Sequence, residues 1–238
     1  MRLSLVLAAL ALALAGCAGG GEDGLPRGAE PVELDPAAFG AEIDNPWWPM
    51  PVGARWVYRE TDAEGTVQRV EVTVTGETRT ILGIEARVVH DVVTEGGELV
   101  EDTYDWYAQD EKGNVWYLGE DTKEYEGGKV VTTAGSWEAG VDGAQPGILL
   151  PADPEPGLSY RQEYYAGEAE DAATVLSLDE RVQVPAGSYA GVLLTKDFTP
   201  LDPDILEYKL YARGVGLVLA LGVSGGSGRE ELIEHRVP

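Results

Sequence analysis

The sequence predicts an all-β fold, an antiparallel β-meander that forms a half-open or closed barrel with at most one or two short helices. Apolar and polar residues alternate with the period of a β-strand in several runs beyond residue 43. Compact clusters of Gly, Asn and Asp separate these runs about every ten to twenty residues, as hairpin turns do. The apolar fraction, 44%, is ordinary for a globular protein, so we expect one folded domain of about ten to twelve strands.

The amino-terminal residues have the pattern of an export signal. Arg2 precedes an uninterrupted run of small and aliphatic residues from Leu3 to Leu14, which suits a secretory signal and is too short for a membrane span. The sequence Leu14-Ala15-Gly16-Cys17 resembles the lipobox of bacterial lipoproteins. That resemblance implies cleavage before Cys17 and acyl chains such as palmitate on that cysteine. The alternative is an ordinary secreted protein with an incidental cysteine.

Three parts of the chain follow from this pattern. Residues 1–16 are the expected signal peptide, and residues 17–42 are rich in Gly, Pro and acid, a composition typical of a flexible tether. Residues 43–238 are expected to form a single β-rich domain. We therefore expect a lipid-anchored protein of the cell envelope, exposed outside the cytoplasm and held in the outer membrane if the organism has one.

Within this domain the alternation and the turns place the elements in order. Strands are predicted at 69–74, 84–93, 100–106 and 206–210, among others, and hairpin turns at 62–65, 95–97, 110–114, 126–128 and 224–228. The one stretch with helical character is 167–178. The proline-rich segment 138–158 is expected either to cross between two halves of the sheet or to form a lip over its mouth.

The charge excludes one class of partner. The chain has 17 Lys and Arg against 42 Asp and Glu, a formal charge of −25, so it lacks the cations that nucleic-acid binding needs. The acidity fits either an ordinary acidic surface or a high-salt habitat. The single cysteine excludes an internal disulfide and a cysteine metal cage. The sequence does not indicate the oligomeric state.

No motif in the sequence predicts catalysis. Gly222-Val-Ser224-Gly-Gly226 matches the G-x-S-x-G nucleophile motif, but the strand-like sequence after it favours a hairpin loop. His90 and His235 lie on apolar strand faces, where two histidines could meet across a barrel at a metal, although core histidines are the commoner case. The carboxylates are too numerous to single out a catalytic pair. We therefore expect no metal, no cofactor and no enzymatic activity, and a hydrolase is the least favoured hypothesis.

The aromatic residues suggest a binding cavity. Trp56 and Tyr58 share one strand face, as do Tyr104 and Trp106, and we expect all four to point into the barrel. A β-cavity lined with aromatic rings suits an apolar ligand. The alternative is a filled core in a structural lipoprotein that meets envelope proteins through its acidic surface.

Three segments together resemble uncharacterised families of bacterial lipoproteins and periplasmic proteins. They are Ile43–Tyr58, with Asn-Pro-Trp-Trp-Pro followed by G-x-x-W-x-Y, Val184-Pro-Ala-Gly-Ser-Tyr189, and Tyr211-Ala-Arg-Gly-Val-Gly-Leu-Val218. These families are similar in fold to lipoprotein-carrier half-barrels and to lipocalins. The resemblance implies the fold and an envelope location, and it implies no catalytic residues.

Overall fold

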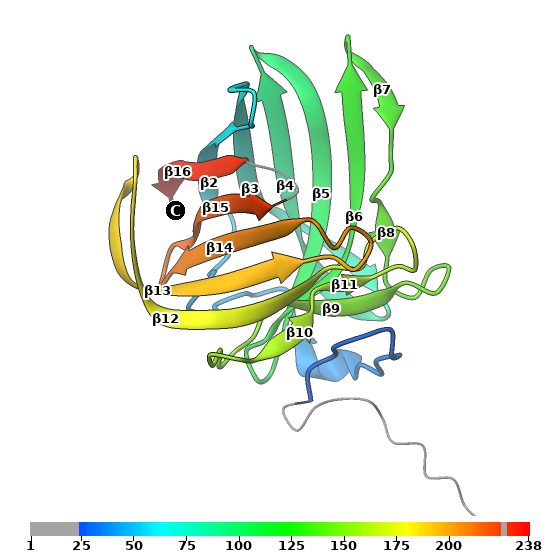
Figure 1. Ribbon diagram of the computed structural model, residues 1–238. Coiled ribbons are helices and arrows are strands. Elements are labelled where there is room, and N and C mark those ends of the chain that lie inside the picture. The colour runs from blue at the N-terminus through cyan, green and yellow to red at the C-terminus, as the bar shows by residue number, and fades with distance from the viewer. Residues whose placement is uncertain (1–23, 225–227) are drawn as a thin grey trace, which may run out of the picture.

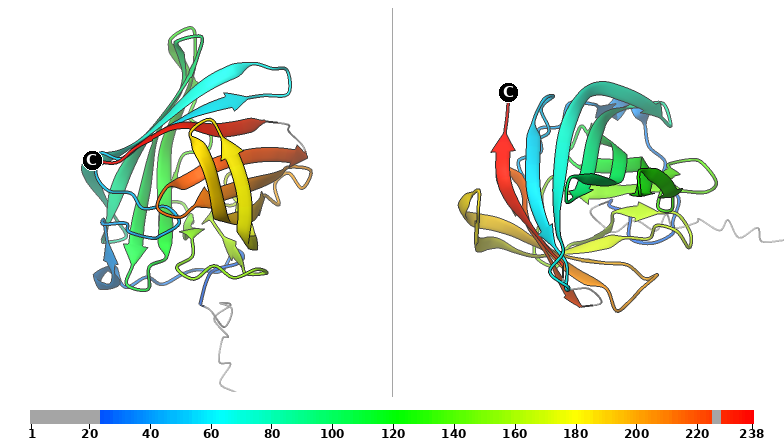
Figure 2. Two further views of the ribbon diagram at one scale, coloured as in Figure 1. Left: turned by 90° about the vertical axis from the view of Figure 1, so that its left-hand side faces the viewer. Right: turned by 90° about the horizontal axis from the view of Figure 1, so that it is seen from above.

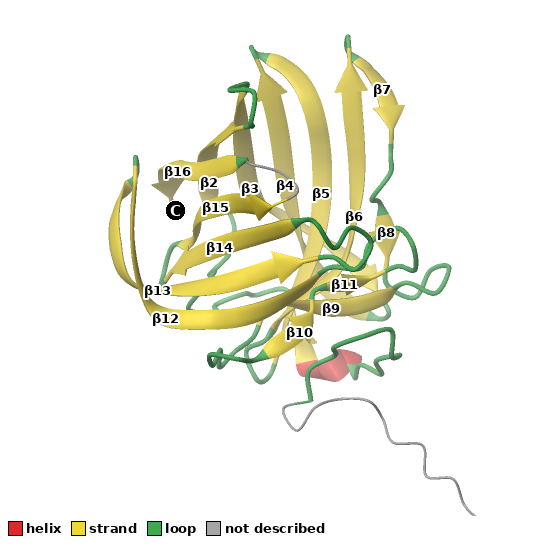
Figure 3. Ribbon diagram, viewed as in Figure 1, coloured by secondary structure: helices red, strands yellow, loops and turns green. Residues whose placement is uncertain are grey.

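The computed structural model describes residues 24–224 and 228–238. An antiparallel sheet winds into a nearly closed barrel, which confirms the all-β prediction (Figure 1). The helical content of these residues is one 3-10 turn, η1 (Pro36–Ala38), seen at the bottom of Figure 3. No helix in the described ranges is both long and apolar enough to cross a membrane.

The strands follow the chain as a meander. Their bounds are β1 (Phe39–Gly40), β2 (Arg55–Thr61), β3 (Val67–Ile81), β4 (Ile84–Glu95), β5 (Glu98–Asp110), β6 (Val115–Glu126), β7 (Lys129–Thr132), β8 (Trp137–Glu138), β9 (Gln145–Leu150), β10 (Ser159–Arg161), β11 (Glu163–Tyr164), β12 (Ala172–Val184), β13 (Gly187–Phe198), β14 (Leu206–Ala212), β15 (Gly216–Ser224) and β16 (Arg229–Arg236). β16 pairs with β2, so the carboxyl-terminal hairpins and the amino-terminal hairpins form one continuous wall.

The two ends of the sheet meet in the segment 159–164, which we call the seam. Its first half, β10, pairs with β12, and its second half, β11, pairs with β9. A Cβ atom on Gly147 of β9 would overlap the backbone carbonyl of Gln162, so the closure depends on glycine at this position. The proline-rich segment 138–158 contains β9 and thus contributes a strand to the barrel wall.

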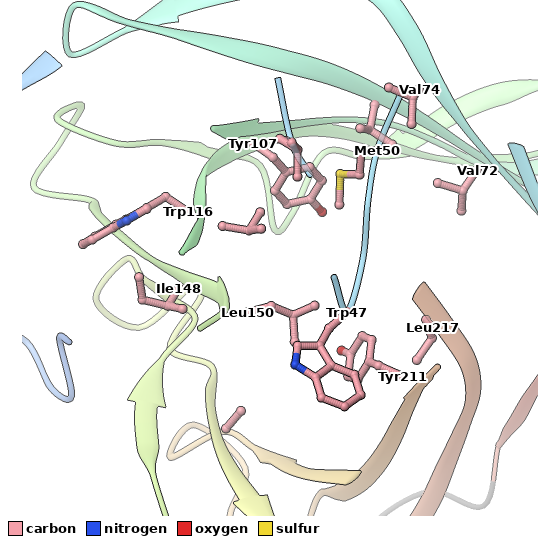
Figure 4. Packing of buried hydrophobic residues seen from close by; sticks show 14 of the residues in the cluster. Trp47, Met50, Val72, Val74, Tyr107, Trp116, Ile148, Leu150, Tyr211 and Leu217 are labelled. Atoms are coloured by element: carbon pink, nitrogen blue, oxygen red, sulfur yellow. The ribbon is translucent and has the colours of Figure 1, made fainter. Parts of the chain in front are cut away.

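The segment 43–54 fills one end of the barrel. The Asn45 side chain accepts a hydrogen bond from the Trp47 amide at 2.9 Å and donates one to the Gly113 carbonyl in the β5–β6 turn at 2.9 Å. The Gly214 amide in the β14–β15 turn donates to the Pro46 carbonyl at 2.8 Å. Trp47 is 1% exposed and lies among Leu150, Tyr211 and Leu217 in Figure 4. The two adjacent tryptophans therefore belong to a plug that closes this end.

The described part of the expected tether makes specific contacts with the barrel. Residues 24–42 lie against the barrel: Leu25 is buried, the Arg161 amide donates to the Pro26 carbonyl at 2.7 Å, and β1 pairs with β5. The Gly- and Pro-rich composition leaves backbone groups unpaired within the segment, and the barrel supplies their partners.

The expected helical stretch at 167–178 was also wrong, because β12 begins at Ala172 and pairs on both sides, with β10 and β13. Three register shifts along β12 bend the β12–β13 hairpin toward β16, where the Ala186 amide donates to the Leu232 carbonyl at 3.1 Å (Figure 2).

Candidate functional site

The inner face of the barrel, which encloses the lumen, is acidic on its β2–β6 side. The register aligns Trp56 with Val72 on β3, then with Asp91 on β4 and Thr103 on β5. Residues opposite each other across a sheet share a face, so Asp91 and Thr103 point the same way as Trp56. Asp105, two residues beyond Thr103, follows on that face and accepts a hydrogen bond from the Tyr117 hydroxyl at 2.7 Å.

The β13–β16 side of the lumen carries charge as well. The register runs from Glu60 on β2 through Glu230 and Ala220 to Lys209 on β14 and Thr195 on β13. The Lys209 ammonium lies 3.3 Å from a carboxylate oxygen of Asp197 and 3.3 Å from one of Glu207. The acidic side chains that lie near one another around the lumen are Glu60, Asp91, Glu101, Asp105, Glu120, Glu163, Asp171, Asp197, Glu207 and Glu230.

A cavity of about 190 Å³ lies beside the plug and is lined by aromatic rings and charged groups, namely Trp48, Tyr107, Tyr117, Leu149, Gln162, Glu163, Asp171, Lys209, Tyr211 and Leu217. The barrel wall surrounds the Lys209 side chain, which is nevertheless 30% exposed. The lumen beside Lys209 is therefore accessible to solvent. Trp137 donates from its indole nitrogen to Glu163 at 2.8 Å and packs edge-on against Tyr117, which holds Glu163 in place.

Enclosure of these carboxylates makes them hard to ionise. Burial raises the pKa of Glu120 to about 9, and repulsion from Asp105 and Glu163 adds to the rise. Burial, followed by repulsion from Asp171, raises the pKa of Glu163 to about 8. Burial also raises the pKa of Asp105 to about 6, although hydrogen bonds from Tyr117 and Tyr107 act against the rise. Near neutral pH part of this wall therefore holds protons.

Lys209, unlike these carboxyl groups, is held in its charged form. Burial alone lowers the pKa of an ammonium group, but the neighbouring Asp197 and Glu207 outweigh burial and raise the pKa of Lys209 well above its ordinary value. Lys209 is thus charged at any physiological pH and neutralises part of the wall on its own side.

Three buried polar atoms around the lumen lack a hydrogen-bond partner within the described part of the chain. They are Oδ1 of Asp91, Nε1 of Trp48 and the hydroxyl of Tyr160. Tyr160 is 1% exposed and interacts electrostatically with Asp197, Tyr211 and Lys209. Buried groups of this kind carry an energetic cost that a ligand with complementary groups would remove.

The four aromatic residues predicted to share a cavity lie on two faces. Trp56 and Tyr58 point inward, where they donate to the carbonyls of Val215 at 2.6 Å and Leu217 at 3.1 Å. Tyr104 and Trp106 alternate with the inward Thr103 and Asp105 and lie on the outer face. There Tyr104 stacks on His90 with ring centroids 4.3 Å apart, and the Arg79 guanidinium covers Trp106 at 4.0 Å.

The other residues singled out in the sequence lie apart from the lumen cavity. His90 contacts Asp102 at 2.6 Å on the outer face, and His235 stacks on Trp56 at 5.2 Å, so the two histidines do not meet. The described ranges contain no group of three or more His, Cys, Asp or Glu placed to hold a metal ion. Ser224 ends β15 and donates to the Asp204 carbonyl, and β16 follows, so a strand stands where the nucleophile motif needs a helix. Cys17 lies outside the described residues.

Comparison with known proteins gives two similar structures. No protein-family model matches the chain, and no curated protein matches it. A candidate lipoprotein from Parabacteroides distasonis has 13% identity and a TM-score of 0.44, and covers 80% of this chain and 98% of its own. A candidate exported protein with a YmcC-like fold from Bacteroides fragilis has 14% identity and a TM-score of 0.47, over the same shares of the two chains.

Proposed function

We propose that this protein is a binding protein whose lumen holds an organic cation. The observation that carries the proposal is the cavity lined by Glu163, Asp171 and aromatic rings. Lys209 lines the same cavity, but its ammonium pairs with Asp197 and Glu207, so negative groups remain in excess. Carboxylates attract a cation strongly where water is partly excluded, and aromatic faces add cation–π attraction. A bound cation would also relieve the repulsion among the carboxylates.

The charged wall favours a cation over the wholly apolar ligand expected from the sequence. An apolar molecule would strip water from Asp91 and Glu163 without replacing its hydrogen bonds. A substituted ammonium group replaces that water with charge and, where it keeps an N–H, with a charge-assisted hydrogen bond.

We place this function in the cell envelope, on the strength of the export signal and the lipobox at Cys17. Two or more acyl chains on that cysteine would hold the barrel at a membrane surface, since one chain binds only marginally. In that position the protein would take its ligand from outside the cytoplasm.

The alternative is a structural or interaction protein with a mostly filled interior. It is favoured by the small size of the lumen cavity, about 190 Å³, because ligand pockets span about 300–1,000 Å³. The strongly acidic chain could then act through its surface.

Calorimetric titration of the domain with tetramethylammonium, at fixed ionic strength, distinguishes the cation-binding function from the structural one. Saturable binding is expected for the cation and not for tert-butanol, a neutral molecule of similar size. Glu163→Gln should weaken that binding by about tenfold or more, the range for a hydrogen bond or ion contact to a charged group. Glu85→Gln, an exposed position on β4, is the matched control and should bind as the natural chain does. Equal binding of both probes, or of neither, would overturn the proposal.

A further inference from the structure

A continuous line of carboxyl groups leads from the lumen cavity along the inside of the barrel. Glu163, which lines the cavity, interacts electrostatically with Asp105. Asp91 interacts with Asp105 on one side and with Glu60 and Glu230 on the other. All five side chains are half-buried, so each is partly open to the lumen.

β5 gives the direction of this line. Tyr107 lines the cavity, and Asp105 and Glu101 follow on the inward face of the same strand. Glu101 lies four residues from Asp105, a distance of about 13 Å at about 3.3 Å per residue. In Figure 1 the strands β9 and β11, which contribute to the cavity, lie low, and the β4–β5 hairpin lies at the top. The line of carboxyl groups therefore extends away from the plug.

The wall beside this line has no cation of its own. Among the described residues, β2–β6 carry no inward-facing Lys or Arg between the level of Asp105 and that of Glu101. The inward positions there are Trp56, Tyr58, Val70, Val72, Val74, Val89, Asp91, Val93, Glu101, Thr103, Asp105, Glu120 and Thr122. Lys209 lies on the β14 side and pairs with Asp197 and Glu207. Oδ1 of Asp91 is buried and has no hydrogen-bond partner within the described ranges.

We infer that the ligand is a linear polyamine, with one terminal ammonium group in the lumen cavity and further ammonium groups beside Asp105, Asp91 and Glu101. The terminal group rests on the function proposed above, and the repeated charge along an unbranched chain is the new element. Methylene segments between the ammonium groups would pass the valines of β3 and β4.

The shape of the lumen suits such a molecule. Only its end group has to fit the cavity of about 190 Å³, so the small volume of that cavity is no obstacle. Both ends of the chain are cations, so binding needs no fixed direction. One molecule with several linked ammonium groups also neutralises several carboxylates at a smaller loss of translational freedom than separate cations.

The test is calorimetric titration, at fixed ionic strength, with butylamine, putrescine, spermidine and spermine, which carry successively more ammonium groups. The affinity should rise about tenfold or more with each added group, the fold-change for one further contact to a charged group, at one ligand per chain. Hexaamminecobalt(III), a compact cation with the charge of spermidine, tests for general attraction to an acidic protein. It should bind far more weakly than spermidine.

Proton release gives a second readout. Burial raises the pKa of Glu163 to about 8 and that of Glu230 to about 7, so near neutral pH part of the line holds protons that a bound cation displaces. Titration in two buffers with different enthalpies of ionisation should show that spermidine releases more protons than tetramethylammonium. A cation that binds to exposed carboxylates would release none, because these groups are already ionised.

Glu101→Gln distinguishes the polyamine from the simple cation. Glu101 lies outside the cavity, and the amide keeps the acceptor oxygen that the Thr103 hydroxyl uses at 3.0 Å. This variant should weaken spermidine binding about tenfold and leave tetramethylammonium binding unchanged, whereas Glu163→Gln should weaken both. Asp91→Asn tests the same wall independently. Glu85→Gln, at an exposed position, removes the same charge and should bind spermidine as the natural chain does.

The outcomes separate the two claims. Binding of tetramethylammonium, with an affinity for spermidine no higher than for butylamine, would overturn the polyamine and leave the cation site standing. Failure of every cation to bind would overturn both. Binding of hexaamminecobalt(III) as tight as that of spermidine, equal proton release, or an unchanged spermidine affinity in both Glu101→Gln and Asp91→Asn would overturn the path along the wall.

Discussion

Glu120 provides a direct test of the lumen electrostatics. This residue lies on β6 and interacts with Asp105 and Glu163, and its pKa is raised from 4.5 to about 9, first by burial and then by repulsion from these neighbours. Between these two values the folded protein keeps a proton on Glu120 that the unfolded chain has released. The folded state therefore binds more protons, and the free energy of unfolding must fall as the pH rises.

The magnitude follows from the proton count. The contribution is fully present below about pH 4.5 and is lost as the pH rises toward 9. One proton corresponds to about 1.4 kcal/mol per pH unit, so Glu120 alone gives a loss of about 3 kcal/mol between pH 6 and pH 8. Glu163, with a pKa of about 8, acts in the same direction. For a domain of this size the loss corresponds to a fall of about 6–12 °C in the unfolding midpoint.

Thermal unfolding of the natural chain and of Glu120→Gln, followed by near-ultraviolet circular dichroism at pH 6, 7 and 8 and constant ionic strength, measures this loss. The variant cannot ionise, so it should be the more stable protein at pH 8 and should show a shallower dependence on pH. Glu126→Gln, at the exposed end of the same strand, should keep the natural slope. A midpoint that is level or rises from pH 6 to pH 8, or an unchanged slope in Glu120→Gln, would refute the account of the lumen.

Three further predictions follow from the same structure. Cation affinity should increase with pH, by up to about tenfold per pH unit below the Glu163 pKa of about 8, because a protonated carboxyl attracts a cation weakly. Calorimetry at pH 6.5 and pH 7.5 measures this increase, and an affinity that does not change with pH would contradict it. Gly147→Ala should destabilise the domain by about 3 kcal/mol or more, since its Cβ would overlap the backbone of Gln162, whereas Gly76→Ala, with only Val52 at 3.8 Å, should cost much less in denaturant unfolding. Cys17→Ser should abolish acylation of the mature terminus, which mass spectrometry would show, and an acylated variant would exclude Cys17 as the attachment site.

The meander was predictable because its signals are local. The alternation around Val70, Val72 and Val74 and the glycine-containing turns at 62–65 and 95–97 lie within a few residues of the structure that they specify. The hairpins therefore follow from neighbouring residues, and β16–β2 pairing then joins them into one wall.

The direction in which each strand faces was less predictable. Alternation separates Asp105 from Trp106, but it does not say which face points inward when the interior is charged. Assigning the apolar face to the interior placed Trp106 and Tyr104 in the lumen, whereas Arg79 and His90 cover them outside. The predicted strand at 206–210 likewise gave no indication that Lys209 and Glu207 line the lumen. Lys209 lies between Tyr208 and Leu210 on its strand, and nothing in that pattern distinguishes an inward lysine from a surface lysine.

Two segments depend on distant partners that their local sequence does not reveal. Residues 24–42 have the composition of a tether, yet Arg161, which lies far along the chain, binds the carbonyls of Gly28 and Glu30. The stretch at 172–178 has residues that a helix accepts, and pairing with β10 and β13 overrides this weak local preference.

The placement of charge inside the barrel supports binding over a purely structural role. A core built for stability alone would gain from replacing Glu120 and Glu163 by apolar residues, since buried carboxylates destabilise a fold unless they are paired. Lys209 lines the same cavity as Glu163 and Asp171, and its ammonium already pairs with Asp197 and Glu207, so the carboxylates outnumber this one cation. Hydrogen bonds from Trp137 and Tyr117 then hold the carboxyl groups of Glu163 and Asp105 in place. Positioned carboxyl groups beside aromatic rings, in excess over the one ammonium group of Lys209, are the arrangement that a cationic ligand completes by favouring their ionised form.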